Sequence, residues 1–155
     1  MNLINWLTLT IRVVDFNLVA NQPDLIGKLR FLTLSPTSCL NHELDWMLKE
    51  APTRHLDCKV FLAYRFRSLI GWGLLSKEDS NFEFTEGSFD SVFRKQDGYL
   101  FQVFIEPGHR RQGIASEIFQ AAQKIVKEDT FCIGPWDNAS YHFYSKFCDV
   151  KKKHL

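Results

Sequence analysis

The alternation of hydrophobic and polar positions predicts strands and helices in a mixed order. A β-branched run at residues 8–14 (TLTIRVV) predicts a first strand. Pro23 then marks the entrance of one or two helices, because proline fits the first helical turn. Apolar residues recur at helical spacing among polar ones over residues 40–49, and Pro52 helps to end the run. This segment is predicted as an amphipathic helix with one buried face.

A hairpin and a central strand are predicted in the middle of the chain. Two strand-like runs, 59–64 (KVFLAY) and 69–75 (LIGWGLL), are separated by four residues, a spacing that suits an antiparallel hairpin. Residues 76–97 are predicted as a long loop or a loop with a short extra hairpin. Residues 98–105 (GYLFQVFI) are nearly continuous in apolar and aromatic side chains, as in a strand covered on both faces. We therefore expect the middle of the sheet at residues 98–105.

The last third of the chain predicts a helix, a short strand and a second helix. Residues 113–127 carry one apolar stripe at helical spacing, with charged and amide side chains opposite it. A short strand at residues 130–133 precedes a helix that Asp137 or Asn138 can cap, because either side chain accepts a bond from an early N–H. No repeat or linker divides the chain, so we expect residues 1–155 to form a single domain.

Composition and charge narrow the partners and the location. A formal net charge of +1 gives no electrostatic argument for a nucleic-acid partner. The four cysteines are widely spaced, without a C-x-x-C pair, and indicate reduced, mostly buried thiols and no metal site. Residues 1–14 lack the basic region and cleavage site of a signal peptide, and no other stretch has the length and apolar content to span a membrane. These features predict a cytoplasmic protein with no membrane partner.

The turn between the central strand and the next helix predicts an anion site. It reads IEPGHRRQGIA over residues 105–115. The first N–H groups of a helix have no intrahelical partners, and the helix dipole favours negative charge there. Small side chains at Gly113 and Ala115 would let a phosphate approach the backbone. A diphosphate could therefore sit on this turn.

The same stretch carries a family resemblance. VFIEPGHRRQGIA resembles the acetyl-CoA signature of the GNAT N-acetyltransferases, R/Q-x-x-G-x-G/A after the fourth strand, with Arg110, Gly113 and Ala115 at its defined positions. FLAY and LIGWGLL are similar to the family's second and third strands, and NASYHFY is similar to its last helix. The resemblance covers residues 59–147, whereas the first 58 residues match only in element order.

The resemblance implies a fold, a reaction and a binding site. The fold is α/β (α+β), with a mixed, mostly antiparallel central sheet, helices on both faces and splayed fourth and fifth strands. The reaction is N-acetyl transfer from acetyl-CoA, as cosubstrate, to a primary amine of a small molecule or protein by direct attack. Pantetheine would enter between the splayed strands, and the end of the fourth strand would offer N–H donors to the oxyanion. The implied cofactor-binding residues are Phe104, Ile105, Arg110, Arg111, Gln112, Gly113, Ile114, Ala115 and Asn138.

The catalytic groups implied by the resemblance are fewer. Tyr144 matches the family's proton donor to the departing thiolate, although a core aromatic is the other interpretation of its position. Asn138 matches a cofactor contact or serves only as a helix cap. The family's strand-four acid would fall near Tyr99, so a base acting through water has to come from the loops, where each candidate is also explained as a solvated residue. These candidates are Glu83, Glu86, Glu106 and His109.

The end of the chain departs from the family pattern. Only 11 residues follow Tyr144, so the family's last hairpin is expected to be absent or very short. The acceptor pocket would then be more open, completed by a partner subunit as in a homodimer, or remodelled. The alternative function is a catalytically weak or inactive acyl-CoA-fold protein that docks onto a partner protein, with aromatic residues Phe82, Phe84 and Phe89 as its interface.

Overall fold

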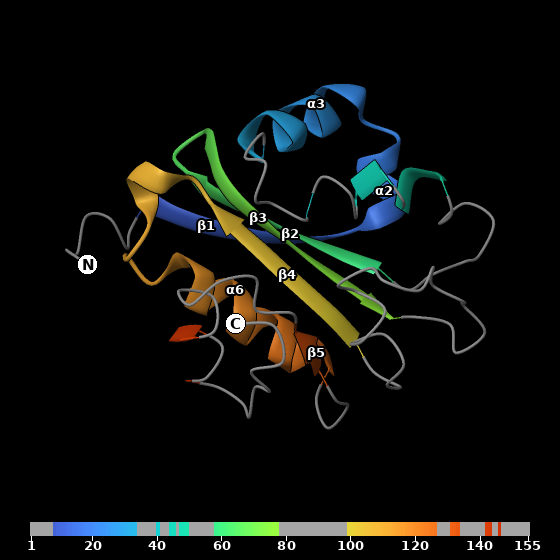
Figure 1. Ribbon diagram of the computed structural model, residues 1–155. Helices are drawn as coiled ribbons and strands as arrows, with labels where there is room; N and C mark the ends of the chain where they lie inside the picture. Colours follow the sequence, from blue (N-terminus) through green and yellow to red (C-terminus); the bar gives the residue numbers. More distant parts are fainter. Residues whose placement is uncertain are drawn as a thin grey trace.

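A β-sheet forms the centre of the molecule (Figure 1). The computed structural model describes residues 8–33, 40, 44–45, 47–49, 58–77, 99–126, 131–133, 142–143 and 146. Four strands pair antiparallel in chain order, and a short fifth strand pairs parallel with the fourth. The predicted mixed, mostly antiparallel sheet is confirmed. The strands are β1 (Leu9–Asp15), β2 (Cys58–Arg65), β3 (Ser68–Lys77), β4 (Tyr99–Ile105) and β5 (Phe131–Ile133).

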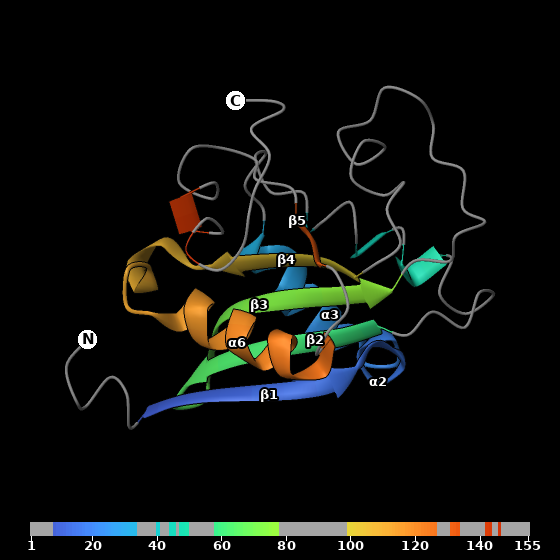
Figure 2. The same ribbon diagram turned by 90° about the horizontal axis from the view of Figure 1, so that it is seen from below.

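Helices cover both faces of the sheet, as expected. The short α2 (Phe16–Ala20) and α3 (Pro23–Leu32) lie on one face, and α6 (Ile114–Val126) lies on the other (Figures 1 and 2). Pro23 occupies the first turn of α3, where its missing N–H leaves no helical bond unmade. No helix within the described ranges has the length and apolar character needed to cross a membrane.

The core consists of two layers separated by the sheet. Along β2, Phe61 and Ala63 pack against α6, whereas Val60 and Leu62 pack against the opposite layer, which follows from the two-residue period of a strand. The α6 layer is closed by buried side chains of its apolar stripe, namely Ile114, Ile118, Phe119, Ala122 and Val126. Cys58 is buried in the other layer, in agreement with its prediction as a core thiol.

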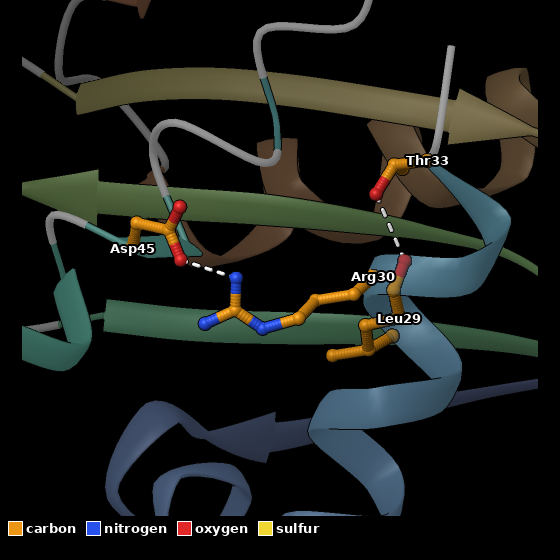
Figure 3. Close-up of polar contacts among 4 residues, drawn as sticks. All are labelled: Leu29, Arg30, Thr33 and Asp45. Carbon is orange, nitrogen blue, oxygen red and sulfur yellow. Dashed lines mark hydrogen bonds and ion pairs between the residues drawn. The ribbon is translucent and has the colours of Figure 1, made fainter.

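The segment predicted as an amphipathic helix around residues 40–49 faces that second layer. Its described residues are helical, with Leu44 and Met47 buried and Asp45 exposed. Arg30 of α3 forms an ion pair with Asp45, as Figure 3 shows. At the end of α3, the Thr33 hydroxyl donates to the Leu29 carbonyl over 2.8 Å (Figure 3). The Arg30–Asp45 ion pair joins α3 to this segment, and the Thr33 bond closes the last turn of α3.

A β-bulge interrupts β3 close to the β2–β3 turn. Ala63 pairs with Gly71 and Tyr64 pairs with Leu69, so Ile70 is an extra residue without a partner on β2. The extra residue reverses the alternation, and Ile70 packs into the α6 layer while Leu69 packs into the other. The Ile70 carbonyl then accepts a hydrogen bond of 2.8 Å from Glu106 N. The bulge thereby extends the pairing of β3 one residue beyond β4.

Gly71 permits a close approach of β3 to the end of β4. A Cβ atom at this position would lie 2.7 Å from Ile105 Cδ1 and 2.8 Å from the Phe104 carbonyl oxygen. Real Cβ atoms do not come this close to a backbone oxygen, so only glycine fits without movement of β4. The last residues of β4 therefore have a position that depends on the missing side chain of Gly71.

Candidate functional site

The segment between β4 and α6 turns sharply at two residues with left-handed backbone. After a single 3-10 turn, η1 (Pro107–His109), Arg111 has φ 60° and Gly113 has φ 79°. The first backbone hydrogen bond of α6 runs from Glu117 N to Gly113 O over 3.1 Å. Within the described part of the chain, no N–H of residues 111–116 donates to a backbone carbonyl outside the helix. These donors lie at the positive end of the helix dipole and suit an anion.

Gly113 suits its position because of its conformation and its surroundings. L side chains rarely adopt a φ of 79°, and a Cβ built there meets no heavy atom of the described residues within 4 Å. The space beside the turn is therefore open to a ligand. The next residues, Ile114 and Ala115, begin α6, with Ile114 buried in the core and Ala115 partly buried.

Arg110 fastens the turn to the end of β4. Its Nε donates to the Ile105 carbonyl over 2.8 Å, and its guanidinium carbon lies 5.3 Å from the centre of the Phe104 ring. This stacked, hydrogen-bonded geometry is specific to the planar guanidinium. Arg110 therefore has a positioning role in the free protein, besides the cofactor-binding role that the family resemblance implies for it. Arg111 is exposed.

Arg65, at the end of β2, reaches the same turn from the neighbouring hairpin. Its Nη1 donates to His109 Nδ1 over 2.7 Å, because a guanidinium has only donors and Nδ1 must accept. The Nε and Nη2 atoms of Arg65 are buried and have no hydrogen-bond partner among the described residues. The Oε1 atom of Gln112 is in the same condition. A guanidinium with unused donors beside the turn adds to its attraction for an anion.

The contact with Arg65 also bears on the base candidates. Since His109 Nδ1 accepts from Arg65, Nε2 carries the proton of the neutral ring, and it lies 3.9 Å from Glu106 Oε2. The His109 lone pair is therefore engaged with Arg65 in this structure. Glu106 follows β4 directly and is half exposed. The candidates Glu83 and Glu86 lie outside the described residues.

β5 covers only the first part of the outer edge of β4. The described pairing ends at Phe101, and the residues of β4 from Gln102 to Ile105 have a described partner strand on the β3 side alone. The predicted splaying of the fourth and fifth strands would lie beyond this point, outside the described residues. The pairs are Tyr99 with Phe131, Leu100 with Cys132 and Phe101 with Ile133.

The direction of the backbone groups at the end of β4 follows from two hydrogen bonds. Glu106 N donates to Ile70 O of β3, whereas the Ile105 carbonyl accepts from Arg110 on the other side. Ile105 therefore turns its carbonyl away from β3, and its N–H points the same way.

Alternation along the strand extends this result to two neighbouring residues. Val103 shares the direction of Ile105, and Phe104 turns its N–H and C=O toward β3. The sequence analysis expects backbone groups from both Phe104 and Ile105, but only Ile105 has the open orientation. The backbone groups of Val103 have the same open orientation as those of Ile105. No local sequence signal distinguishes Val103 from its neighbours.

The remaining candidates fall at the end of the chain. Tyr144 and Asn138 lie outside the described residues. Phe143, the residue before Tyr144, packs its ring on Phe119 of α6, with centroids 6.3 Å apart. Among the described residues, no three His, Cys, Asp or Glu side chains are grouped as metal ligands.

Comparisons with solved structures identify the fold. A predicted acetyltransferase with acetyl-CoA from Clostridium acetobutylicum has a TM-score of 0.60 and 16% identity, over 95% of this chain and 93% of that chain. The aminoglycoside N-acetyltransferase AAC(6')-Iy in complex with CoA gives 0.55 and 15%, over 94% and 95%. A ribosomal-protein-alanine N-acetyltransferase from Brucella melitensis biovar Abortus 2308 gives 0.54 and 8%, over 95% and 96%. At these identities the likeness concerns the fold alone.

Sequence comparison identifies the family. No curated protein matches the chain. The model of the acetyltransferase (GNAT) family matches residues 28–149, a range that includes the hairpin, β4, the turn and α6. The predicted resemblance is confirmed, and the chain belongs to the GNAT acetyltransferase family.

Proposed function

We propose that the protein moves an acetyl group from acetyl-CoA to a primary amine of a small molecule or a protein. One observation carries the proposal: among the described residues, N–H groups without a backbone partner at a left-handed turn lie directly after a strand whose outer edge is unpaired from Gln102 to Ile105. The first feature suits a diphosphate and the second suits an extended amide chain. Both groups occur in coenzyme A, and two of the similar structures have CoA or acetyl-CoA bound.

Residues of the turn and of β4 would hold the coenzyme. The N–H groups of residues 111–116 would bind the diphosphate, and the Arg65 guanidinium would add positive charge. The open backbone groups of Val103 and Ile105 would pair with the pantetheine arm. Asn138 would add a contact from the end of the chain. Bound acetyl-CoA supplies an activated acetyl group on sulfur.

Transfer requires one bond to form and one to break. The amine nitrogen bonds to the carbonyl carbon, the carbon–sulfur bond breaks, and the sulfur takes a proton. Tyr144 is our candidate for the donor of that proton, and Glu106 is the described candidate that could accept the proton of the amine through water. The proposed acceptor is the class of primary amines, because loops and termini select the individual acceptor in this architecture.

Two experiments test the proposal in sequence. Calorimetric titration of acetyl-CoA into the protein should give saturable binding, and a thiol-release assay with amines should then give turnover. An aminoglycoside and a peptide with an N-terminal alanine are suitable acceptors, since the similar structures include an aminoglycoside N-acetyltransferase and a ribosomal-protein-alanine N-acetyltransferase. Absence of acetyl-CoA binding by the folded protein would overturn the proposal.

One observation favours a second candidate, a CoA-binding protein with weak or absent catalysis. β4 has no carboxylate in its sequence, and the His109 lone pair is occupied by Arg65. Saturable binding without thiol release, in parallel with an active acetyltransferase, would select this candidate. The partner protein would then be the ligand to identify. We propose that the protein is located in the cytoplasm. A homodimer is one way in which the acceptor pocket would be completed.

A further inference from the structure

Gln102 has a buried side chain whose amide oxygen lacks a hydrogen-bond partner among the described residues. It stands within β4 and is 8% exposed. Its Oε1 atom is inaccessible to solvent and has no hydrogen-bond partner among the described residues. A buried amide oxygen left unpaired destabilises the free protein. A ligand that donates a hydrogen bond to this oxygen would remove that penalty.

The face of the sheet on which Gln102 lies follows from its cross-strand partner. Gln102 pairs with Leu74 of β3, and Leu74 is buried in the layer beneath α2 and α3. Directly opposed residues of antiparallel strands point to the same face. Gln102 therefore points away from α6, toward the layer that contains α2 and α3.

The position of Gln102 along the strand is equally specific. The described pairing of β5 with β4 ends at Phe101, so within the described residues the unpaired edge of β4 begins at Gln102. Ile105, at the other end of that edge, lies next to the turn that would bind the diphosphate. Strand residues advance by about 3.3 Å each, which places Gln102 about 10 Å from Ile105. A pantetheine arm that binds along this described edge from the turn would therefore bring its reacting end close to Gln102.

We propose that Gln102 Oε1 accepts a hydrogen bond from the acceptor amine. The inference rests on the proposed function, because it needs an acyl donor on the open edge of β4. A primary amine carries N–H donors in both its neutral and protonated forms, which matches a lone amide oxygen. Gln102 is thus a substrate-binding residue that selects amines, separate from the residues that hold the coenzyme.

Equilibrium binding without turnover tests this assignment. Free CoA has no acetyl group, so an amine can be titrated calorimetrically into CoA-saturated protein. The probes are kanamycin and a short peptide with an N-terminal alanine. Gln102→Leu should weaken binding of the preferred probe by about 10- to 100-fold, the effect of losing one hydrogen bond to a charged group. Its affinity for CoA should remain within about two-fold, because uncharged Gln102 lies outside the coenzyme's predicted contacts.

Thermal unfolding separates this role from a merely structural one. Gln102→Leu should raise the Tm of the ligand-free protein by about 2–4 °C, because it removes an unpaired buried polar group. If Gln102 instead made a structural hydrogen bond, Gln102→Leu would lower the Tm. Gln102→Glu keeps an acceptor oxygen at the same length and should restore amine binding. Gln120→Leu, on the exposed side of α6, is the matched control and should leave both affinities unchanged.

Each outcome decides between the inference and its alternatives. Unchanged amine affinity in Gln102→Leu overturns the inference alone, as does a lowered Tm with equal losses for amine and CoA. Trp72, on the same face, has a buried indole N–H without a described partner. If Trp72→Phe lowers amine affinity as much as Gln102→Leu does, the Trp72 and Gln102 side chains pair with each other, and this outcome also overturns the inference. A parent protein that binds CoA but neither probe also overturns the inference. A parent that binds no CoA overturns the proposed function first.

Discussion

Three residues at the β4–α6 turn would contribute differently to the proposed binding of an anion. Gly113 provides the left-handed backbone and open space, Arg110 ties the turn to β4, and Arg65 brings a guanidinium from another hairpin. Only the first two belong to the sequence signature. A contact between residues 44 positions apart in the chain cannot be inferred from local pattern, which explains why Arg65 was not a candidate.

Gly113→Asp should abolish coenzyme binding in a folded protein. A carboxylate at this site would face the diphosphate at short range, where repulsion between unit charges reaches about 4 kcal/mol, so affinity should fall by about 100-fold or more. Gly113→Ala is the matched control, because it introduces the same left-handed strain of about 1–2 kcal/mol without charge. Calorimetry with acetyl-CoA measures both variants. Equal losses in the two would assign the effect to strain and contradict the electrostatic explanation.

Tyr144→Phe should separate binding from chemistry. The ring remains, so acetyl-CoA affinity should match the parent, whereas turnover should fall by about 10²- to 10⁴-fold if the hydroxyl donates the proton. Thiol release at saturating acetyl-CoA is the measurement. A near-normal rate would mean that Tyr144 is a core aromatic, like its neighbour Phe143, whose ring packs on Phe119 of α6. Tyr141→Phe, alone and in combination, tests whether Tyr141 replaces the missing acid.

Elements are the scale at which the sequence was most informative. Apolar, strand-like runs predicted β2, β3 and β4, and the 3.6-residue period predicted α6, with bounds within one or two residues of those observed. The bulge at Ile70 was not predicted, because an extra residue leaves no mark on a nearly continuous apolar run. Tyr144 and Asn138 stay predictions. Gln102 did leave a signal, as a lone polar residue in a buried strand.

Gly71→Ala should damage both the sheet and the site. Its Cβ would overlap the Phe104 carbonyl oxygen at 2.8 Å, so β4 would have to move, at a cost of about 1–3 kcal/mol. Displacement of Ile105 should also weaken acetyl-CoA binding. Urea unfolding and calorimetry give the two quantities. Gly27→Ala is the control, since no described atom lies within 4 Å of its added Cβ and alanine favours α3 by about 0.5–1 kcal/mol. A parent-like midpoint for Gly71→Ala would show that β4 adapts freely.

The whole molecule joins two layers through one sheet, and the proposed coenzyme site lies at the end of that sheet. The family model matches residues 28–149, and the similar acetyltransferase from Clostridium acetobutylicum covers 95% of the chain. Binding at the turn between β4 and α6 should therefore stabilise the folded state as a unit.

Acetyl-CoA should raise the unfolding temperature of the intact protein. At 100 times its dissociation constant, a ligand specific for the folded state adds about 2.7 kcal/mol, which corresponds to about 5–11 °C for a chain of this size. Differential scanning calorimetry checks the shift. Gly113→Asp at the same ligand concentration should give a shift of at most about 2 °C, because its affinity is expected to be at least about 100-fold lower. A shift of equal size in that variant would place the ligand elsewhere.

The bulge at Ile70 has a consequence for how this chain can change by insertion and deletion. Removing one residue from most of β3 would turn every following side chain to the opposite face. Removing Ile70 would restore regular alternation, since Leu69 and Gly71 already face opposite layers. The Ile70 carbonyl, however, holds Glu106 at the entrance of the turn. The residue that β3 can lose without changing its faces is therefore one that the proposed coenzyme site would need, so length variation in this hairpin and retention of that site would be in conflict.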